Sequence, residues 1–210
     1  MAGEILSPAV EDYLYGMLPE RDPVLREMEE YAKEHHVPII GPAVARMIYM
    51  LTQLSGARRI FEMGSAIGYS TVWLARAAGP GGRVFYTDGG EENVRRARDY
   101  CQRAGVARRV NFLHGDALEL IKTVPGRFDL IFLDVDKPQY PDALHVALPR
   151  LRRGGLFITD NTLWSGKVAG AASDDATKAI RALNTEMYES PKLFPVIVPL
   201  RDGVTVCRKL

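Results

Sequence analysis

The chain has 210 residues, 47% of them hydrophobic and 25% charged, which is the composition of a globular protein with one sizeable core. A formal net charge of +1 gives no global reason to expect nucleic acid or an acidic membrane as a partner. Cys101 and Cys207 fit a reduced compartment and lack metal-ligand spacing. The start, MAGEILSPAVEDYLYG, lacks the pattern of a signal peptide, and no apolar run is long enough to span a membrane. We therefore expect a soluble, cytoplasmic protein.

The first 55 residues have a helical pattern. Asp22 is a favourable N-cap and Pro23 suits the first helical position. The apolar face of this helix consists of Val24, Leu25 and Met28. His35 and His36 follow at its end, where a cation suits the helix dipole, and their adjacent side chains diverge too much to favour a metal site. A second helix is expected over roughly 42–54.

Strands and helices alternate through the rest of the chain. Apolar runs predict strands at 60–63, 84–86, 110–113, 128–133 and 156–159, with helices at 71–78, 91–104, 117–124, 140–151 and 174–189. The end, LFPVIVPLRDGVTVCRKL, predicts an antiparallel pair joined by a turn at Asp202-Gly203. The pattern predicts an α/β fold whose parallel sheet is covered on both faces and carries one antiparallel strand at its edge. We treat 1–210 as one domain, with a helical cap at 1–55 and an α/β core at 56–210.

The segment Ile60 to Ser70, IFEMGSAIGYS, organises this core. A buried strand stops at Gly64, a turn of small residues follows, and a helix begins near Ser70. Such a turn lets the backbone approach a ligand, with helix N–H groups pointing outward. Its G-x-x-x-G spacing differs from the G-x-G-x-x-G of dinucleotide-binding proteins. The loop alone is also consistent with simple tight-turn chemistry.

Successive strands carry polar residues where they end, namely Gly64, Asp88, Asp134 and Asp160-Asn161. The carboxyl ends of parallel strands meet at one edge of the sheet, so these residues are expected to converge, although each acid could also cap its own loop. Asp88 fits a residue that accepts hydrogen bonds from ribose hydroxyls, a device that NAD enzymes share. Asp116 and Ala117 are placed to meet an adenine ring, and Asp116 could equally cap the helix that follows.

Asp134, Asp160 and Asn161 offer three oxygen ligands on neighbouring strand ends. Two carboxylates and an amide oxygen suit a hard ion such as Mg²⁺. Lys137 follows three residues after Asp134 and is within reach of the same site, where it could act as a general base. The alternative for Lys137 is a solvated surface side chain.

Three stretches resemble one known family. FEMGSAIGYS, FDLIFLDVDKPQY and GGLFITDNTLWSGKV, in this order, look like the cation-dependent class I O-methyltransferases, which include the catechol and caffeoyl-CoA O-methyltransferases and small bacterial members. The likeness runs from about Ile40 to the carboxyl terminus. It implies a three-layer, Rossmann-like methyltransferase fold with a mostly parallel seven-stranded sheet, one antiparallel edge strand and N-terminal helices.

The resemblance also implies roles for individual residues. Binding of S-adenosylmethionine (SAM) is expected to involve Ile40, Glu62, Gly64, Ser65, Ser70, Asp88, Asp116, Ala117 and Asp134. Asp134, Asp160 and Asn161 are expected to bind Mg²⁺ or another divalent cation. Lys137 is expected to be the general base, with Asp134 beside it in the catalytic site, and Trp164 to flank the entrance for a small phenolic acceptor with vicinal hydroxyls. The amphipathic first helix and the habit of the family favour a homodimer.

The chain departs from the family pattern at several positions. Gly89-Gly90 replaces an apolar residue and an acid, which weakens the expected packing on adenosine. Pro138 directly follows Lys137, Met63 replaces Ile or Leu, and Ala45-Arg46 replaces a glycine and a glutamine. Two alternatives stay open: a nicotinamide oxidoreductase, and a non-catalytic or weakly active cofactor-binding protein of the same fold.

Overall fold

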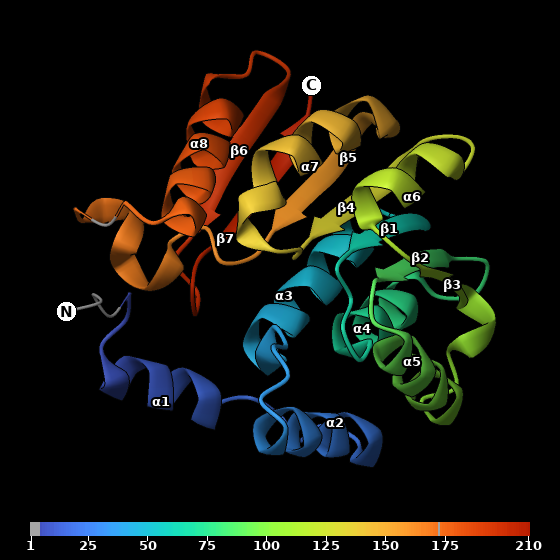
Figure 1. The fold of residues 1–210 in the computed structure, drawn as a ribbon. Coiled ribbons are helices and arrows are strands. Elements are labelled where there is room, and N and C mark those ends of the chain that lie inside the picture. The colour runs from blue at the N-terminus through green and yellow to red at the C-terminus, as the bar shows by residue number, and fades with distance from the viewer. Residues whose placement is uncertain (1–4, 172) are drawn as a thin grey trace.

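The computed structural model describes residues 5–171 and 173–210, so the first four residues of the predicted helical segment lie outside the described residues. Seven strands form one sheet in the order β3-β2-β1-β4-β5-β7-β6 (Figure 1). The strands are β1 (Arg59–Met63), β2 (Arg83–Asp88), β3 (Val110–His114), β4 (Phe128–Leu133), β5 (Leu151–Thr159), β6 (Leu193–Val198) and β7 (Val204–Lys209). The first five strands pair in parallel, which confirms the predicted α/β class.

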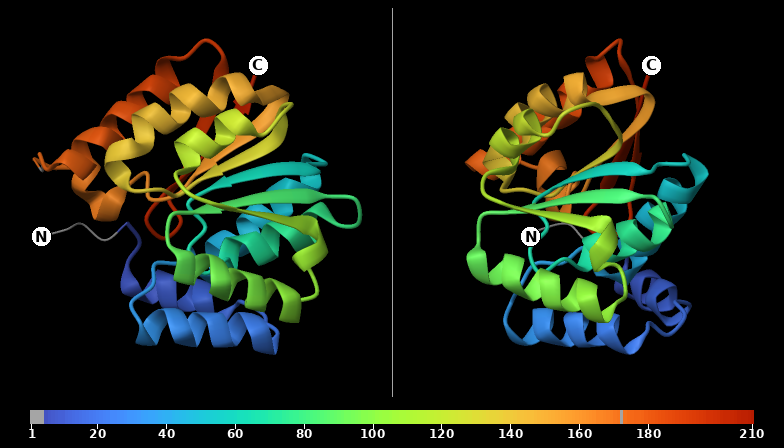
Figure 2. Two further views of the ribbon diagram at one scale, coloured as in Figure 1. Left: turned by 45° about the vertical axis from the view of Figure 1, so that its right-hand side comes forward. Right: turned by 90° about the vertical axis from the view of Figure 1, so that its right-hand side faces the viewer.

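Helices cover both faces of the sheet (Figures 1 and 2). One layer contains α3 (Gly41–Leu54), α4 (Tyr69–Ala78) and α5 (Glu91–Arg103), and the other contains α6 (Ala117–Thr123), α7 (Tyr140–Ala147) and α8 (Asp175–Glu189). Alternate residues of the strands build two separate cores because successive side chains point to opposite faces. Ile60 and Phe132 pack with the first layer, whereas Phe61 and Leu133 pack with the second.

The amino-terminal segment adds two helices outside the first layer, α1 (Pro8–Gly16) and α2 (Pro23–Glu34). The Asp22 side chain caps α2 as predicted, because its carboxylate accepts hydrogen bonds from Val24 N and Leu25 N at 3.1 and 3.3 Å. Leu25 and Met28 are buried within the chain. The apolar face of this helix is therefore already covered.

The structure refines the predicted elements in three places. The antiparallel strand is β7, which pairs with both β5 and β6, so it lies one position inside the edge that β6 forms. The predicted helix 140–151 ends at Ala147, because Pro149 lies in a short 3-10 turn. β5 begins at Leu151 and runs through Gly154 and Gly155. A Cβ at Gly155 would lie 2.8 Å from the Asp129 carbonyl oxygen, so a glycine is required inside this strand.

Cys101 and Cys207 are both free and buried, as expected of structural thiols. In the part of the chain that the structure describes, no helix combines the length and apolar character needed to cross a membrane.

Candidate active site

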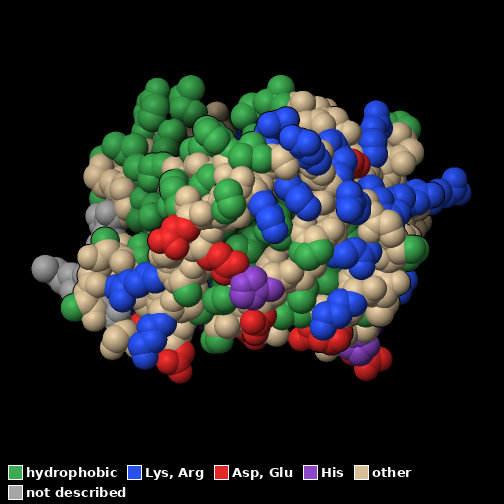
Figure 3. All heavy atoms as spheres, turned by 90° about the horizontal axis from the view of Figure 1, so that it is seen from above, with side chains coloured by type: hydrophobic (Ala, Val, Ile, Leu, Met, Phe, Trp, Pro, Cys, Tyr) green, Lys and Arg blue, Asp and Glu red, His purple; other side chains and the backbone are tan. Residues whose placement is uncertain are grey.

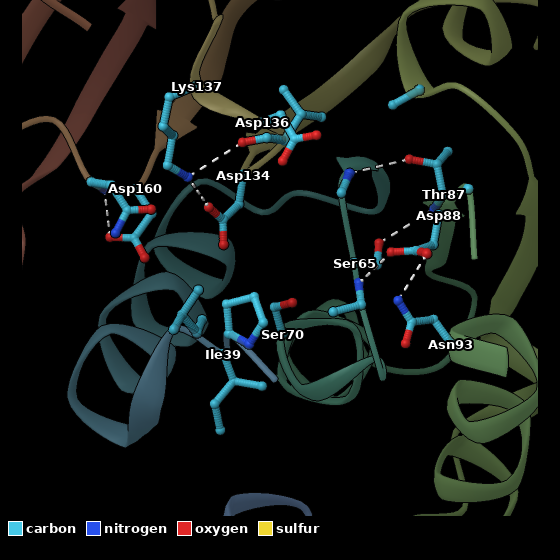
Figure 4. A pocket seen from close by; sticks show the side chains of 18 of the residues that line it. Ile39, Ser65, Ser70, Thr87, Asp88, Asn93, Asp134, Asp136, Lys137 and Asp160 are labelled. Carbon is cyan, nitrogen blue, oxygen red and sulfur yellow. Dashed lines mark hydrogen bonds and ion pairs between the residues drawn. The ribbon is translucent and has the colours of Figure 1, made fainter. Parts of the chain in front are cut away.

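A cleft of about 1090 Å³ lies at the carboxyl edge of the sheet and spans the strand ends on both sides of the β1–β4 boundary. The chain changes its direction of winding at this boundary, which is where ligands bind in open α/β sheets. Figure 4 shows two groups of side chains in it. We call the part formed after β1 and β2, with Ser65, Thr87, Asp88 and Asn93, the glycine-loop side. We call the part formed after β4 and β5, with Asp134, Lys137, Asp160, Asn161 and Trp164, the acidic side.

Gly64 brings the glycine loop into contact with the neighbouring strand end. Its φ is +81°, and a Cβ there would lie 2.4 Å from the carbonyl oxygen of Asp134. Only glycine fits this position, because the obstructing atom belongs to the backbone. The loop is fixed further by hydrogen bonds from Ser65 N to Thr87 O at 3.0 Å and from Gly64 N to the Thr87 hydroxyl at 3.3 Å. The glycine loop therefore has a fixed conformation at the edge of the cleft.

Asp88 ends β2 and faces the cleft, as the sequence predicted. One carboxylate oxygen accepts a hydrogen bond from Ala66 N at 2.9 Å. The other accepts from Gly90 N at 2.7 Å and from the Asn93 amide at 3.0 Å. Asp88 thus organises its own loop, and its Oδ2, which accepts one hydrogen bond, retains a lone pair that can accept from a ligand. Both roles of this residue are compatible with the geometry.

The other predicted cofactor residues occupy different positions relative to the cleft. Ile40, Ser70 and Ala117 line it, as does Asp116, whose side chain also caps α6 by accepting from Leu118 N and Glu119 N. Glu62 is fully buried under the loop and does not line the cleft. Thr71 donates a hydrogen bond to its Oε2 at 2.5 Å, and its Oε1 has no partner among the described residues. Burial raises the pKa of Glu62 to about 7, although neighbouring hydroxyl groups lower it.

On the acidic side, Asp134 and Lys137 form an ion pair. Lys137 Nζ lies 2.9 Å from Asp134 Oδ1 and 3.3 Å from the carbonyl oxygen of Val135. The Lys137 side chain is only 14% exposed, which excludes the solvated surface lysine considered above. Its Nζ lies 4.9 Å from the ring centre of Tyr140 and 5.9 Å from that of Trp164, so two aromatic rings border the amine.

Asp160 is the most deeply buried carboxylate of the cleft, with 1% of its surface exposed. Its Oδ1 accepts from Asn161 N at 2.9 Å, and the Asn161 amide nitrogen donates to Asp202 at 3.3 Å. Burial raises the pKa of Asp160 to about 7, and the nearby charge of Asp134 adds to that rise. Burial likewise raises the pKa of Asp134, against the effect of Lys137. The two carboxylates therefore repel each other inside a poorly solvated site.

This donor set fits a hard divalent cation. Asp134, Asp160 and Asn161 all line the same cleft at adjacent strand ends, and a cation between them would relieve the repulsion of the two carboxylates. Within residues 5–171 and 173–210, no three His, Cys, Asp or Glu side chains gather in a metal-binding arrangement. His35 and His36 are thus not part of such a group. Any ion at this edge would depend on the Asn161 oxygen as its third protein ligand.

Other residues line the cleft that were not predicted as site residues from the sequence, among them His36, Asn93 and Arg201. Arg201 lies in the turn before β7, and its Nη1 is 3.5 Å from Asp160 Oδ2. The sequence predicted the neighbouring turn at Asp202-Gly203, but the position of Arg201 beside Asp160 depends on the pairing of β7 with β5, which the sequence pattern does not specify. Asn93 and His36 had no signal in the sequence pattern.

Comparison with known proteins identifies the family. A parallel sheet with this strand order and a glycine turn at its switch point defines an α/β protein of the nucleotide-cofactor-binding class. The model of a family described as O-methyltransferase matches residues 18–210, and the chain belongs to this family. The predicted family, fold class and O-methyltransferase activity are thereby confirmed. The nicotinamide oxidoreductase alternative loses its support.

Characterised relatives share most of their length with this chain. The catechol O-methyltransferase of Mycobacterium tuberculosis is 35% identical over 89% of this chain and 86% of its own length. An O-methyltransferase from Bacillus cereus, solved in complex with SAH, is 29% identical with a TM-score of 0.87 and covers 96% of this chain and 97% of its own. An O-methyltransferase from Streptomyces achromogenes involved in tomaymycin synthesis, solved in complex with SAM, is 26% identical with a TM-score of 0.87, and the match covers 96% of both chains.

Proposed function

We propose that this O-methyltransferase transfers the methyl group of SAM to one hydroxyl of a catechol-like small molecule, with a divalent cation bound at the acidic side. The observation that carries the proposal is the meeting in one cleft of the glycine turn, Asp88 and the set Asp134, Lys137, Asp160 and Asn161. The names of the relatives support the donor and the acceptor class, since one is a catechol O-methyltransferase and another was solved with SAM.

The glycine-loop side would hold the donor. Gly64 and Ser65 present backbone, Asp88 would accept from the ribose, and Ala117 would contact the adenine. Ile40 and Ser70 also line the cleft, and Glu62 would act from its buried position beneath the loop. Fixing donor and acceptor side by side can supply several kcal/mol of the barrier.

The acidic side would hold the acceptor. When bound, a divalent ion supplies positive charge that orients vicinal oxygens and lowers the pKa of a hydroxyl, while SAM supplies an electrophilic methyl group. Lys137 Nζ would take the proton of the hydroxyl to be methylated, and Asp134, 2.9 Å away, would hold the amine in place. The rings of Tyr140 and Trp164 beside Nζ would form an apolar wall for a flat phenolic ring.

Transfer of a labelled methyl group from SAM to a panel of catechols, with Mg²⁺ or with EDTA, tests this function. Lys137→Ala should lower kcat by about 10²–10⁴ while leaving SAM binding unchanged, because a general base contributes roughly that factor. Lys167→Ala is the matched control, since Lys167 also lies against the Trp164 ring, at 5.5 Å, without contacting Asp134.

Each failure of this assay has its own meaning. Full activity of Lys137→Ala would show that Lys137 is not the general base. Activity that survives EDTA would show that the reaction needs no divalent cation. SAM binding without transfer to any vicinal diol would favour the non-catalytic alternative.

We also propose that the helical cap, residues 1–55, and the α/β core, residues 56–210, function together as one domain.

We further propose a homodimer. The apolar face of α2 is buried, whereas α1 exposes Val10, Tyr13 and Leu14, followed by Met17 at its C-cap, at helical spacing. Figure 3 shows the face of the molecule that is at the top in Figure 1. Apolar side chains gather on one half of this face, and Lys and Arg side chains on the other half. Exposed apolar residues also include Tyr188, Phe194 and Val196. Light scattering coupled to gel filtration would return a monomer mass if this proposal were wrong.

A further inference from the structure

Arg201 is placed at the acidic side by the turn between β6 and β7. β7 runs antiparallel to β5, and Thr205 pairs with Thr159, so the turn lies where β5 ends. Backbone hydrogen bonds fix it against the segment after β5, from Thr162 N to Gly203 O at 3.0 Å and from Leu163 N to Asp202 O at 2.9 Å. The turn, and with it the base of the Arg201 side chain, therefore has a defined position beside the cleft.

The conformation of Arg201 is unusual for its residue type. Its φ is +52°, in the left-handed region that a residue with a Cβ adopts at an energetic cost. A glycine would adopt this conformation freely. The turn therefore carries an arginine where backbone geometry alone would favour glycine.

The guanidinium contacts the buried carboxylate of the proposed cation site. Arg201 Nη1 lies 3.5 Å from Asp160 Oδ2, and Asp160 is 1% exposed whereas Arg201 is 34% exposed. In the described part of the chain, Arg201 is the one cationic side chain within ion-pair distance of Asp160, as Lys137 is for Asp134. Each carboxylate of the proposed site thus already has a positive charge supplied by the chain.

Arg201 and a divalent ion are both attracted by the negative charge of the Asp160 carboxylate and repel each other beside it. A bound Mg²⁺ requires its ligand oxygens at about 2.0–2.1 Å, and a guanidinium at a neighbouring position would repel it. A contact of 3.5 Å is at the long limit of a hydrogen bond, and the side chain that makes it is partly exposed. Arg201 is therefore able to leave Asp160, and the need for its departure opposes binding of the ion.

We propose that Arg201 is a built-in counter-ion that neutralises Asp160 when the cation site is empty and competes with the divalent ion for that carboxylate. This inference rests on the proposed function, because it takes Asp134, Asp160 and Asn161 as the ion's ligands. It predicts that the chain binds divalent ions more weakly than its ligand set alone would allow.

Direct binding of Mn²⁺ to the full-length protein, without SAM or acceptor, tests the inference by calorimetry or electron paramagnetic resonance. Arg201→Gln and Arg201→Gly should each lower the Kd for Mn²⁺ by about tenfold, since a positive charge next to the ion is removed. Arg201→Gly also suits the positive φ, so it protects the test against a folding defect. Lys167→Gln, which removes a cation that contacts Trp164, should leave the Kd unchanged.

The double variant Arg201→Gln/Asp160→Asn separates the two proposals. If it loses the Mn²⁺ binding that Arg201→Gln gains, the measured ion lies at Asp160 and the competition is supported. An unchanged or raised Kd in both Arg201 variants, with binding still lost on Asp160→Asn, would overturn the role of Arg201 and keep the cation site. Absence of Mn²⁺ binding in every protein would overturn both.

Discussion

On the glycine-loop side, Asp88 is held by the backbone N–H groups of Ala66 and Gly90, whereas on the acidic side Asp134 and Asp160 face the side-chain cations of Lys137 and Arg201. Backbone donors cannot move without unfolding the loop, but lysine and arginine side chains can rotate away. Damage to the glycine-loop side should therefore lower stability and donor binding together. Damage to the acidic side should alter ion binding or turnover while the fold persists.

The largest expected effect comes from Gly64→Ala. The new Cβ would lie 2.4 Å from a backbone oxygen of Asp134 at a φ of +81°, so strain and overlap combine. We expect a loss of about 3 kcal/mol or more in the free energy of unfolding, with SAM binding abolished, measured by urea denaturation and calorimetry.

Gly105→Ala is the control that isolates backbone strain. Gly105 has a φ of +71°, and a Cβ added there would have no atom within 4 Å, so its substitution should cost only about 1 kcal/mol. Equal losses in the two variants would mean that the close approach of the loop to Asp134 contributes nothing, and the contrast between the two sides would lose its basis.

The next effect, of similar or smaller size, concerns the titration of Glu62. Its pKa lies near 7 in the folded protein against an ordinary value of 4.5, so the folded state binds this proton more tightly than the unfolded state. The free energy of unfolding should therefore fall as pH rises from 4.5 to 7, by about 3 kcal/mol from this group. Below pH 4.5 both states are protonated and this loss is absent.

Glu62→Gln should remove that part of the pH dependence. Asp160, whose pKa is also raised to about 7, remains in both proteins, so the difference between the two stability curves isolates Glu62. The variant should gain stability relative to the parent at about pH 8 and show little difference at about pH 4. Parallel curves over this range would place the strongly perturbed carboxylates on the acidic side alone.

The two sides also differ in how well sequence predicts them. Gly64 and Asp88 follow buried strands directly, and the ends of parallel strands converge, so local patterns locate them. Asp134 and Asp160 were predicted at this edge in the same way, and Lys137 from its spacing of three residues after Asp134. Arg201 is 41 residues from Asp160 and meets it only through the pairing of β5 with β7, which hydrophobic periodicity does not specify.

Other deviations have local physical causes. The helix that begins at Tyr140 ends before Pro149, although its apolar pattern continues. Gly155 lies inside β5, although a glycine pair usually marks a break, because the backbone of β4 approaches it too closely for a side chain. The two possible roles of Asp116 could not be separated by sequence, and the structure gives it both a helix cap and a place in the cleft.

The smallest expected effect comes from a substitution at Gly89, on the glycine-loop side, where space for a side chain is available. Gly89 lines the cleft, has no atom within 4 Å of where a Cβ would lie and does not adopt a left-handed φ, so a side chain fits there. Gly89→Val should lower the Kd for SAM by about fivefold, because roughly 40 Å² of new apolar contact with adenosine contributes about 1 kcal/mol.

Gly90→Ala provides the contrast one residue along. Its Cβ would lie 3.1 Å from Asp88 Oδ1 and 3.3 Å from the Asn93 amide nitrogen, so it presses on the groups that hold Asp88 and should weaken SAM binding. Isothermal titration with SAM should therefore give a lower Kd for Gly89→Val and a higher Kd for Gly90→Ala than for the parent protein. If Gly89→Val instead weakened SAM binding, the adenosine would have to lie elsewhere in the cleft. Asp88 would then serve its loop alone, through the hydrogen bonds that it accepts from Ala66, Gly90 and Asn93.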